Sequence, residues 1–279
     1  MATETRRSSI SLDILGAVGG SVSKLRSIIP PDMHVRFVEP IGIGPAWSLR
    51  AKIKRLADAG ISVSEIHGPT GADGKHQFFD EVRLRGMQTA FVSPEMLVRK
   101  FSDYELLMHT PVAAQRNIFQ AFAKKPPTYT WIENHNFGKE GVSEAASLVD
   151  AWRKAGILTG IMYDVVHEMG SKALTSQREF PKAWKGMLHT MRRYSSLITG
   201  VHFPVGTFQT DSLPMQWITD DMLREFNDSL PRHTRTVVVE NQQDGGKLLF
   251  LSRRAAGDAQ RRNGIIFHRL QKAGIVDFS

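Results

Sequence analysis

Short apolar runs recur along the chain, and most of them end abruptly in an ionisable side chain. The clearest is GIMYDVVH at residues 160–167, where a β-branched apolar run ends in Asp164 and His167 follows three residues later. The same pattern closes five other runs, at residues 62–67, 105–109, 128–133, 199–202 and 235–240. A hydrophobic run that stops at ionisable residues is typical of a buried barrel strand with ligands at its carboxyl end.

Two further strand-like runs, at residues 10–15 and 35–39, bring the predicted strands to eight. Helical spacing of apolar residues separates the strands, at residues 24–28, 47–59, 94–101, 112–122, 143–155, 181–194, 219–226 and 259–273. Gly60 and Gly156 follow two of these helices at the position where a helix usually ends. Between residues 71 and 103 the pattern is less regular: residues 77–85 look helical, and residues 87–92 fit a helix, a loop or an extra strand.

The alternation of strands and helices favours a parallel sheet, because parallel neighbours need a crossover connection. Eight such units in 279 residues predict an α/β protein with the (β/α)8 TIM barrel fold. We expect a flexible N-terminus at residues 1–9 and a single barrel domain over residues 10–279. An open doubly wound sheet is the alternative, but the sequence has no GxGxxG after its first strand and no GxxxxGK[ST].

Composition narrows the chemistry. The chain is 41% hydrophobic without an apolar stretch long enough to span a membrane, and its first residues lack the apolar segment of a secretory signal, so we expect a cytoplasmic protein with no membrane partner. It has no cysteine, which excludes disulfides, thiolate zinc sites and a cysteine nucleophile. The net charge of +8 favours polyanionic partners such as nucleic acid or a phosphorylated substrate, although the basic residues are scattered, as in an ordinary soluble basic protein.

A barrel brings the carboxyl ends of its strands to one mouth. Seven ionisable side chains are therefore expected around a single pocket: His67, His109, Glu133, Asp164, His167, His202 and Glu240. Burying so many imidazoles and carboxylates is costly unless something pairs them, and a divalent cation is the natural partner. The mixed oxygen and nitrogen donors suit Mn, Zn, Co, Fe or Mg.

The order Glu133, Asp164-x-x-His167, His202 and Glu240 resembles that of the xylose isomerase-like superfamily, which contains sugar isomerases, ketose 3-epimerases and endonuclease IV. The resemblance implies that Glu133, Asp164, His202 and Glu240 hold a divalent metal and that His167 faces the substrate. It further implies that Glu133 and Glu240 act as acid and base on a small sugar or sugar phosphate. In that chemistry a metal-stabilised enediolate forms after a proton leaves the carbon next to a carbonyl.

Endonuclease IV is the rival within this resemblance. His67 and His109 match positions that in that family add ligands for a second metal, shared through Glu133, and in a sugar enzyme they would contact the substrate instead. The positive charge suits a phosphodiester backbone of abasic or damaged DNA. Against it, Asp211 is followed by Ser212 and Leu213 rather than by the histidine of a third metal site, and residues 68–70 carry no bulky wedge. The small-sugar interpretation is slightly favoured.

Other interpretations stay open. The chain could be a barrel that binds a partner without catalysis, since fold alone does not fix function, and it could form a homo-oligomer. Ordinary structural roles are expected for several residues near the predicted mouth or in the barrel. Internal ion pairing is expected for Asp13 and Glu39, loop packing for His135, core packing for Trp131, Met162, Phe203 and Phe208, and solvent exposure for Arg253, Arg254, Arg261 and Arg262.

Overall fold

The computed structural model describes residues 6–11, 29–40, 46–68, 94–135, 141–206, 212–242 and 253–278. The strands are β1 Arg7–Ser11, β2 Phe37–Glu39, β3 Ser62–Val63, β4 Ile66–His67, β5 Glu105–His109, β6 Tyr129–Glu133, β7 Thr159–Asp164, β8 Ile198–Gly206 and β9 Thr236–Gln242. The helices are α3 Ala46–Asp58, α5 Pro94–Phe101, α6 Thr110–Ala113, α7 Arg116–Lys124, α8 Gly141–Lys154, α9 Val165–Met169, α10 Ser171–Leu174, α11 Phe180–Arg193, α12 Asp220–Ser229 and α13 Arg253–Lys272. Among these helices, none is long and apolar enough to cross a membrane.

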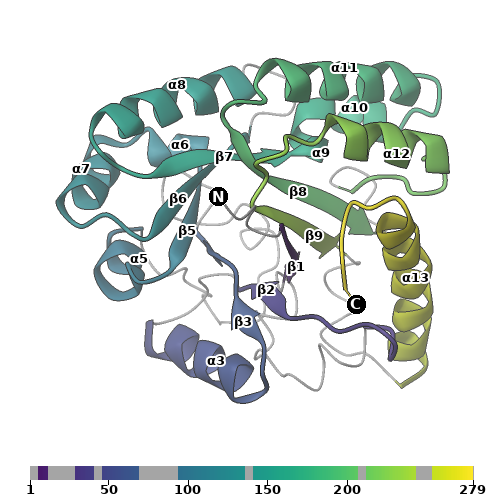
Figure 1. Cartoon of the computed structure of the whole chain (residues 1–279), viewed down its shortest axis with the longest axis horizontal. Coiled ribbons are helices and arrows are strands. Elements are labelled where there is room, and N and C mark those ends of the chain that lie inside the picture. Colours follow the sequence, from purple (N-terminus) through teal and green to yellow (C-terminus); the bar gives the residue numbers. More distant parts are fainter. Residues whose placement is uncertain are drawn as a thin grey trace, which may run out of the picture.

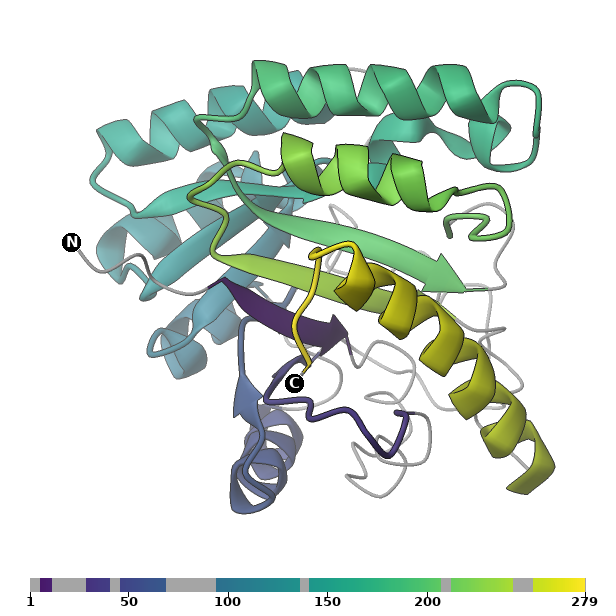
Figure 2. The same ribbon diagram turned by 45° about the vertical axis from the view of Figure 1, so that its right-hand side comes forward.

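All the strands belong to one parallel sheet with the order β3-β2-β1-β9-β8-β7-β6-β5-β4. The two ends of this order are halves of one predicted strand, residues 62–67. Backbone hydrogen bonds continue through the break, because Ser64 N donates to Val38 O at 2.9 Å and His67 N donates to Pro40 O at 3.0 Å. Strand β4 pairs with β5 on its other side, so the sheet closes on itself. Helices lie around its outside (Figures 1 and 2), and the predicted TIM barrel is confirmed.

Several boundaries differ from those predicted. Strand β1 begins at Arg7, three residues before the predicted start. The helix predicted at residues 112–122 is two helices, because Gln115 adopts an extended conformation between α6 and α7. The predicted strand at residues 160–167 ends at Asp164, where α9 begins, so that His167 is helical. The helical segments predicted at residues 24–28 and 77–85 and the ambiguous segment at 87–92 lie outside the described residues.

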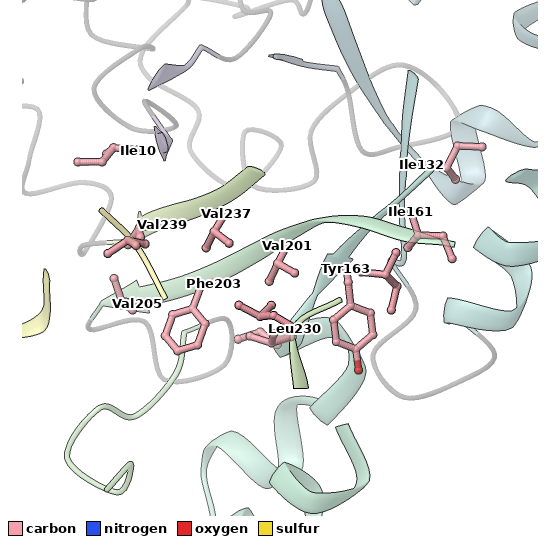
Figure 3. Close-up of a cluster of buried hydrophobic side chains, with 14 of the residues drawn as sticks. Ile10, Ile132, Ile161, Tyr163, Val201, Phe203, Val205, Leu230, Val237 and Val239 are labelled. Carbon is pink, nitrogen blue, oxygen red and sulfur yellow. The ribbon is translucent and has the colours of Figure 1, made fainter. Parts of the chain in front are cut away.

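Alternate side chains of each strand face outward and pack against the helices. Figure 3 shows this layer, which includes Ile161, Tyr163, Val201, Phe203 and Val239. The hydroxyl group of Tyr163 has a hydrogen-bond partner in this layer. Its Oη donates to the backbone oxygen of Met187 at 2.8 Å. Removal of these side chains from water is what holds the helices on the barrel.

The inward side chains fill the barrel below the mouth. Leu107, Trp131, Met162 and Val238 form a separate buried apolar cluster, so the core roles predicted for Trp131 and Met162 are confirmed. The indole needs room on the neighbouring strand: a Cβ added to Gly200 would lie 2.6 Å from the Trp131 ring. Only glycine fits there without displacing the ring.

An ion cluster lies at the amino ends of the strands. Glu105 accepts from Arg7 Nη2 at 2.7 Å, from Arg235 Nη2 at 3.0 Å and from Trp131 Nε1 at 3.0 Å. The Arg235 guanidinium also lies 4.3 Å from the centre of the Tyr129 ring. Because this end is occupied by paired groups, ionisable side chains that face a ligand are expected only at the opposite, carboxyl end.

Candidate metal centre

The barrel mouth gathers all seven predicted site residues. They are His67 in β4, His109 in β5, Glu133 in β6, Asp164 in β7, His167 in α9, His202 in β8 and Glu240 in β9. Each is buried, with an exposed fraction between 0% and 8%. Residues from six strands and one helix, far apart in the sequence, therefore form one cluster.

His67, His109 and Glu133 form one half of this cluster. The two Nε2 atoms lie 3.3 Å apart, and they lie 3.6 Å (His67) and 3.0 Å (His109) from Glu133 Oε2. Ligands held 2.0–2.1 Å from a tetrahedral zinc ion are about 3.3 Å apart, so these spacings suit a cation. No residue that the structure describes donates a hydrogen bond to Glu133 Oε2. The donor set fits a divalent metal.

His202 is the centre of the other half. Its Nδ1 atom lies 3.3 Å from Glu133 Oε1 and 3.1 Å from Glu240 Oε1. Donor atoms of Asp164, His202 and Glu240 lie within 4.8 Å of one another. Glu133 thus directs one oxygen toward each half, as a bridging carboxylate does.

The Asp164-x-x-His167 spacing has a local structural cause. Asp164 is the N-cap of α9, and its Oδ1 accepts from the backbone N–H groups of Val166 and His167, both at 2.8 Å. This cap places His167 one turn into the helix, where its Nδ1 lies 2.8 Å from Asn134 O. Asn134 also binds Asp164 twice, accepting from its N at 2.8 Å and donating to its O at 3.0 Å. Asn134 was not predicted from the sequence as a site residue, and its position directly after Glu133 was the only signal.

Backbone carbonyl oxygens fix the ring direction of two of the imidazoles. His67 Nδ1 lies 2.7 Å from Gly68 O, and His167 Nδ1 faces Asn134 O. A carbonyl only accepts, so in each ring Nδ1–H is the donor and Nε2 carries the lone pair. Metal-ligating histidines make the same kind of contact through their second nitrogen.

Comparison with known proteins places this fold. No protein-family model and no curated protein matches the sequence. Among solved structures, endonuclease IV from Thermus thermophilus superposes with a TM-score of 0.52 at 14% identity, over 95% of this chain and 99% of that one. A xylose isomerase domain protein from Planctomyces limnophilus gives 0.51 at 10% identity, over 96% and 97%.

The chain has the fold of the xylose isomerase-like TIM barrels. A D-tagatose 3-epimerase-like protein is also similar, with a TM-score of 0.49 at 10% identity over 95% of this chain and 98% of that one. Identities this low speak for the fold alone. What this xylose isomerase-like barrel does has to be argued from its own side chains.

Burial and neighbouring charges both shift the pKa values of the side chains in the barrel mouth, in some cases in opposite directions. Burial lowers the pKa of His202, but the carboxylates of Glu39, Glu240 and Glu133 outweigh it and raise that pKa well above its ordinary value. Burial, and then the charge of Glu133, raise the pKa of Asp164 to about 7. Without a cation, therefore, protons on His202 and Asp164 balance the carboxylates at the mouth of this barrel.

Two buried glutamates and the half-buried His135 adjoin the site. Glu39 does form the predicted internal ion pair, but its partner is His202, at 2.8 Å. His135 Nδ1 lies 3.1 Å from His109 Nδ1, and burial followed by the charge of His167 lowers the pKa of His135 to about 4. Glu65 was not singled out in the sequence: neither of its oxygens has a hydrogen-bond partner among the described residues, and burial raises its pKa to about 8.

The remaining predicted roles are simple. Phe203 packs outward against Phe226, with ring centres 5.1 Å apart, and Arg261 and Arg262 are exposed, as expected. Asp13, Phe208 and Asp211 lie outside the described residues, as do the side chains of Arg253 and Arg254.

Proposed function

We propose that the protein is a divalent-metal-dependent enzyme with two neighbouring cation positions that share Glu133. His67, His109 and Glu133 would hold one cation, and Asp164, His202 and Glu240 would hold the other together with Glu133. The observation that carries this proposal is the division of the Glu133 carboxylate: Oε2 faces nitrogens of His67 and His109, and Oε1 faces nitrogens of His202 and His167. A cation at the first position would also account for the close approach of His67 Nε2 and His109 Nε2, which lie 3.3 Å apart.

The reaction that best suits this arrangement is hydrolysis of a phosphate ester, as in the endonuclease IV branch of the resemblance. Two adjacent cations, held by the residues named above, would supply Lewis-acid chemistry that suits an in-line displacement at phosphorus. A net charge of +8 suits a phosphodiester substrate such as abasic DNA. The sequence slightly favoured a reaction on a small sugar. The close pair His67 and His109 instead favours hydrolysis of a phosphate ester.

Exposure distinguishes the residues that face the substrate. His167 and Glu240 are 8% and 7% exposed, whereas the other five site residues are between 0% and 4% exposed. The substrate would therefore approach beside His167 and Glu240. Nδ1 of His167 is held by Asn134 O at 2.8 Å, so its ring has a fixed direction from which to hydrogen-bond a phosphate or sugar oxygen.

A second candidate is isomerisation or epimerisation of a small sugar or sugar phosphate. It is favoured by the placement of two carboxylates around one point: Glu133 Oε1 and Glu240 Oε1 lie 3.3 and 3.1 Å from the same His202 nitrogen. Carboxylates on two sides of a substrate carbon can remove a proton and return it. This reaction needs only the second cation position and leaves His67 and His109 as substrate contacts.

The two reactions are separated by assay of one preparation. Metal-loaded protein is incubated with a duplex that carries one abasic site and, separately, with a panel of ketoses and ketose phosphates. Strand cleavage that EDTA abolishes supports the first proposal, and ketose interconversion with the duplex intact supports the second. Glu240→Gln should abolish whichever activity appears, while Glu225→Gln, on the exposed face of α12, should not. Inactivity of the wild-type protein on both substrate classes would contradict both proposals.

A further inference from the structure

Glu39 lies directly behind His202 in the barrel interior. Its Oε2 atom is 2.8 Å from His202 Nε2, and both side chains are fully buried. Its other oxygen, Oε1, accepts from Ser11 Oγ at 3.1 Å. The hydroxyl, the carboxylate and the imidazole come from β1, β2 and β8, and together they form a buried chain of hydrogen bonds that ends at the metal centre.

We infer that Glu39 is a positioning residue that orients His202 toward the shared cation position. An ionised carboxylate only accepts hydrogen bonds, so His202 donates through Nε2–H and presents the lone pair of Nδ1 to the opposite side. On that side lie Glu133 Oε1 and Glu240 Oε1, at 3.3 and 3.1 Å. This inference rests on the proposed function and adds to it the residue that fixes one ligand.

The geometry of His202 explains why this support is needed. Nδ1 is the atom that meets Glu133 and Glu240, so a ring flip would turn a carbon toward them instead. The contact with Glu39 opposes such a flip, because it would be lost at the same time. Ser11 fixes the carboxylate in turn, so that the ring direction is set by strands on the far side of the closed sheet. Outer contacts of this kind typically change metal affinity by about 10 to 100-fold when they are removed.

Glu65 provides a matched contrast. Like Glu39 it is a fully buried glutamate, and its donor atoms lie within 4.8 Å of those of Glu39 and His202. Within the described part of the chain, however, no group donates a hydrogen bond to either Glu65 oxygen. Glu65 therefore does not orient a site residue, and its replacement by glutamine should disturb packing in the same region without disturbing His202.

The test compares the affinity of Zn²⁺ for Glu39→Gln and Glu65→Gln, measured by competition with a chromophoric chelator. Glutamine keeps the shape of the glutamate side chain, but its amide has only one acceptor oxygen and cannot accept hydrogen bonds from both Ser11 and His202. Glu39→Gln should therefore bind the cation at the His202 position about 10 to 100-fold more weakly than wild type. Glu65→Gln should stay within about twofold of wild type, and Ser11→Ala should lie between the two. The imidazole N–H resonance of His202, assigned by its absence in His202→Asn, should move upfield in Glu39→Gln and stay in place in Glu65→Gln.

Three results would contradict the role inferred for Glu39 or the proposed function. Unchanged Zn²⁺ affinity in Glu39→Gln, with normal binding by wild type, would overturn the role of Glu39 and leave the metal centre intact. Equal losses in Glu39→Gln and Glu65→Gln would also overturn it, because the two carboxylates would then act alike. A wild-type protein that binds no Zn²⁺ would refute the proposed function as well.

Discussion

The Nε2 atoms of His67 and His109 lie 3.3 Å apart at the mouth of the barrel. Two ring nitrogens this close are stable when a proton or a cation lies between them, and Glu133 Oε2 completes a set of three donors around that place. The same glutamate reaches His202 with its other oxygen. A single carboxylate therefore joins two donor sets, and the predictions below depend on this arrangement.

Replacement of His109 should remove one cation and leave the other. His109→Asn takes away one of the two nitrogens at the first position but does not touch Asp164, His202 or Glu240. The metal content should fall by one ion per chain, measured by mass spectrometry of the native protein. His189→Asn, on the exposed face of α11, is the control and should keep the full content.

Replacement of Glu133 should have a larger effect, because both positions use this residue. Glu133→Gln should weaken binding at both by more than about 100-fold, which is the upper end of the effect expected for an outer contact. It should also abolish activity on any substrate. Isothermal titration with Zn²⁺ measures the binding; a variant that still binds two ions tightly would show that Glu133 is not shared.

The stability of the metal-free protein should fall as the pH rises from about 6.5 to 8. Burial raises the pKa of Glu65 to about 8 and that of Asp164 to about 7, and the carboxylates around His202 raise its pKa well above the ordinary value. In this range the folded chain holds more protons than the unfolded chain, so each added pH unit favours unfolding.

Other groups do not reverse this sign within the window. Burial lowers the pKa values of His109 and His135, and in the unfolded chain these side chains lose their protons around pH 6.5, so they oppose the trend only at the start of the window. The protons that Glu65, Asp164 and His202 hold in the folded chain are lost across the whole window and outweigh them. Thermal unfolding in EDTA should therefore give a lower Tm at pH 8 than at pH 6.5. Saturating Zn²⁺ displaces the protons, so the trend should weaken or reverse; an EDTA-treated protein whose Tm rises over this range would contradict the charge balance described for the mouth.

Gly200 should not tolerate a side chain. A Cβ at this position would lie 2.6 Å from the Trp131 ring and 2.7 Å from Met162 Sδ. Gly200→Ala is expected to destabilise the fold by about 1–3 kcal/mol through overpacking. Gly186→Ala is the matched control, since no described atom lies within 4 Å of its added Cβ and alanine favours a helix such as α11. Chemical denaturation measures the free energy of unfolding of both variants. Equal stability of the two variants would show that the side chains inside the barrel can move aside to accommodate a Cβ at position 200.

The sequence predicted the barrel and its mouth because both follow from local pattern. Each strand reads as an apolar run that ends in an ionisable residue, and a parallel barrel brings those ends together. The cap that Asp164 provides for α9 also leaves a local signature, the D-x-x-H spacing. These features need no knowledge of distant contacts.

The sequence could not predict the relations between residues that are far apart. Glu39 and His202 are separated by 163 positions, and nothing near Glu39 indicates which group it pairs with. The break in the third strand and the extended Gln115 between α6 and α7 likewise leave no mark in the spacing of apolar residues. That neither Glu65 oxygen has a hydrogen-bond partner among the described residues depends on neighbours from distant parts of the chain, and only coordinates show it.

The number of divalent ions bound per chain shows whether Glu133 joins two cation positions. Purified protein is saturated with Zn²⁺, dialysed, and analysed by inductively coupled plasma mass spectrometry together with the Glu133→Gln variant. We expect two ions per wild-type chain and the loss of both in the variant. A wild-type chain that retains no ion, or a Glu133→Gln chain that retains two, would contradict it.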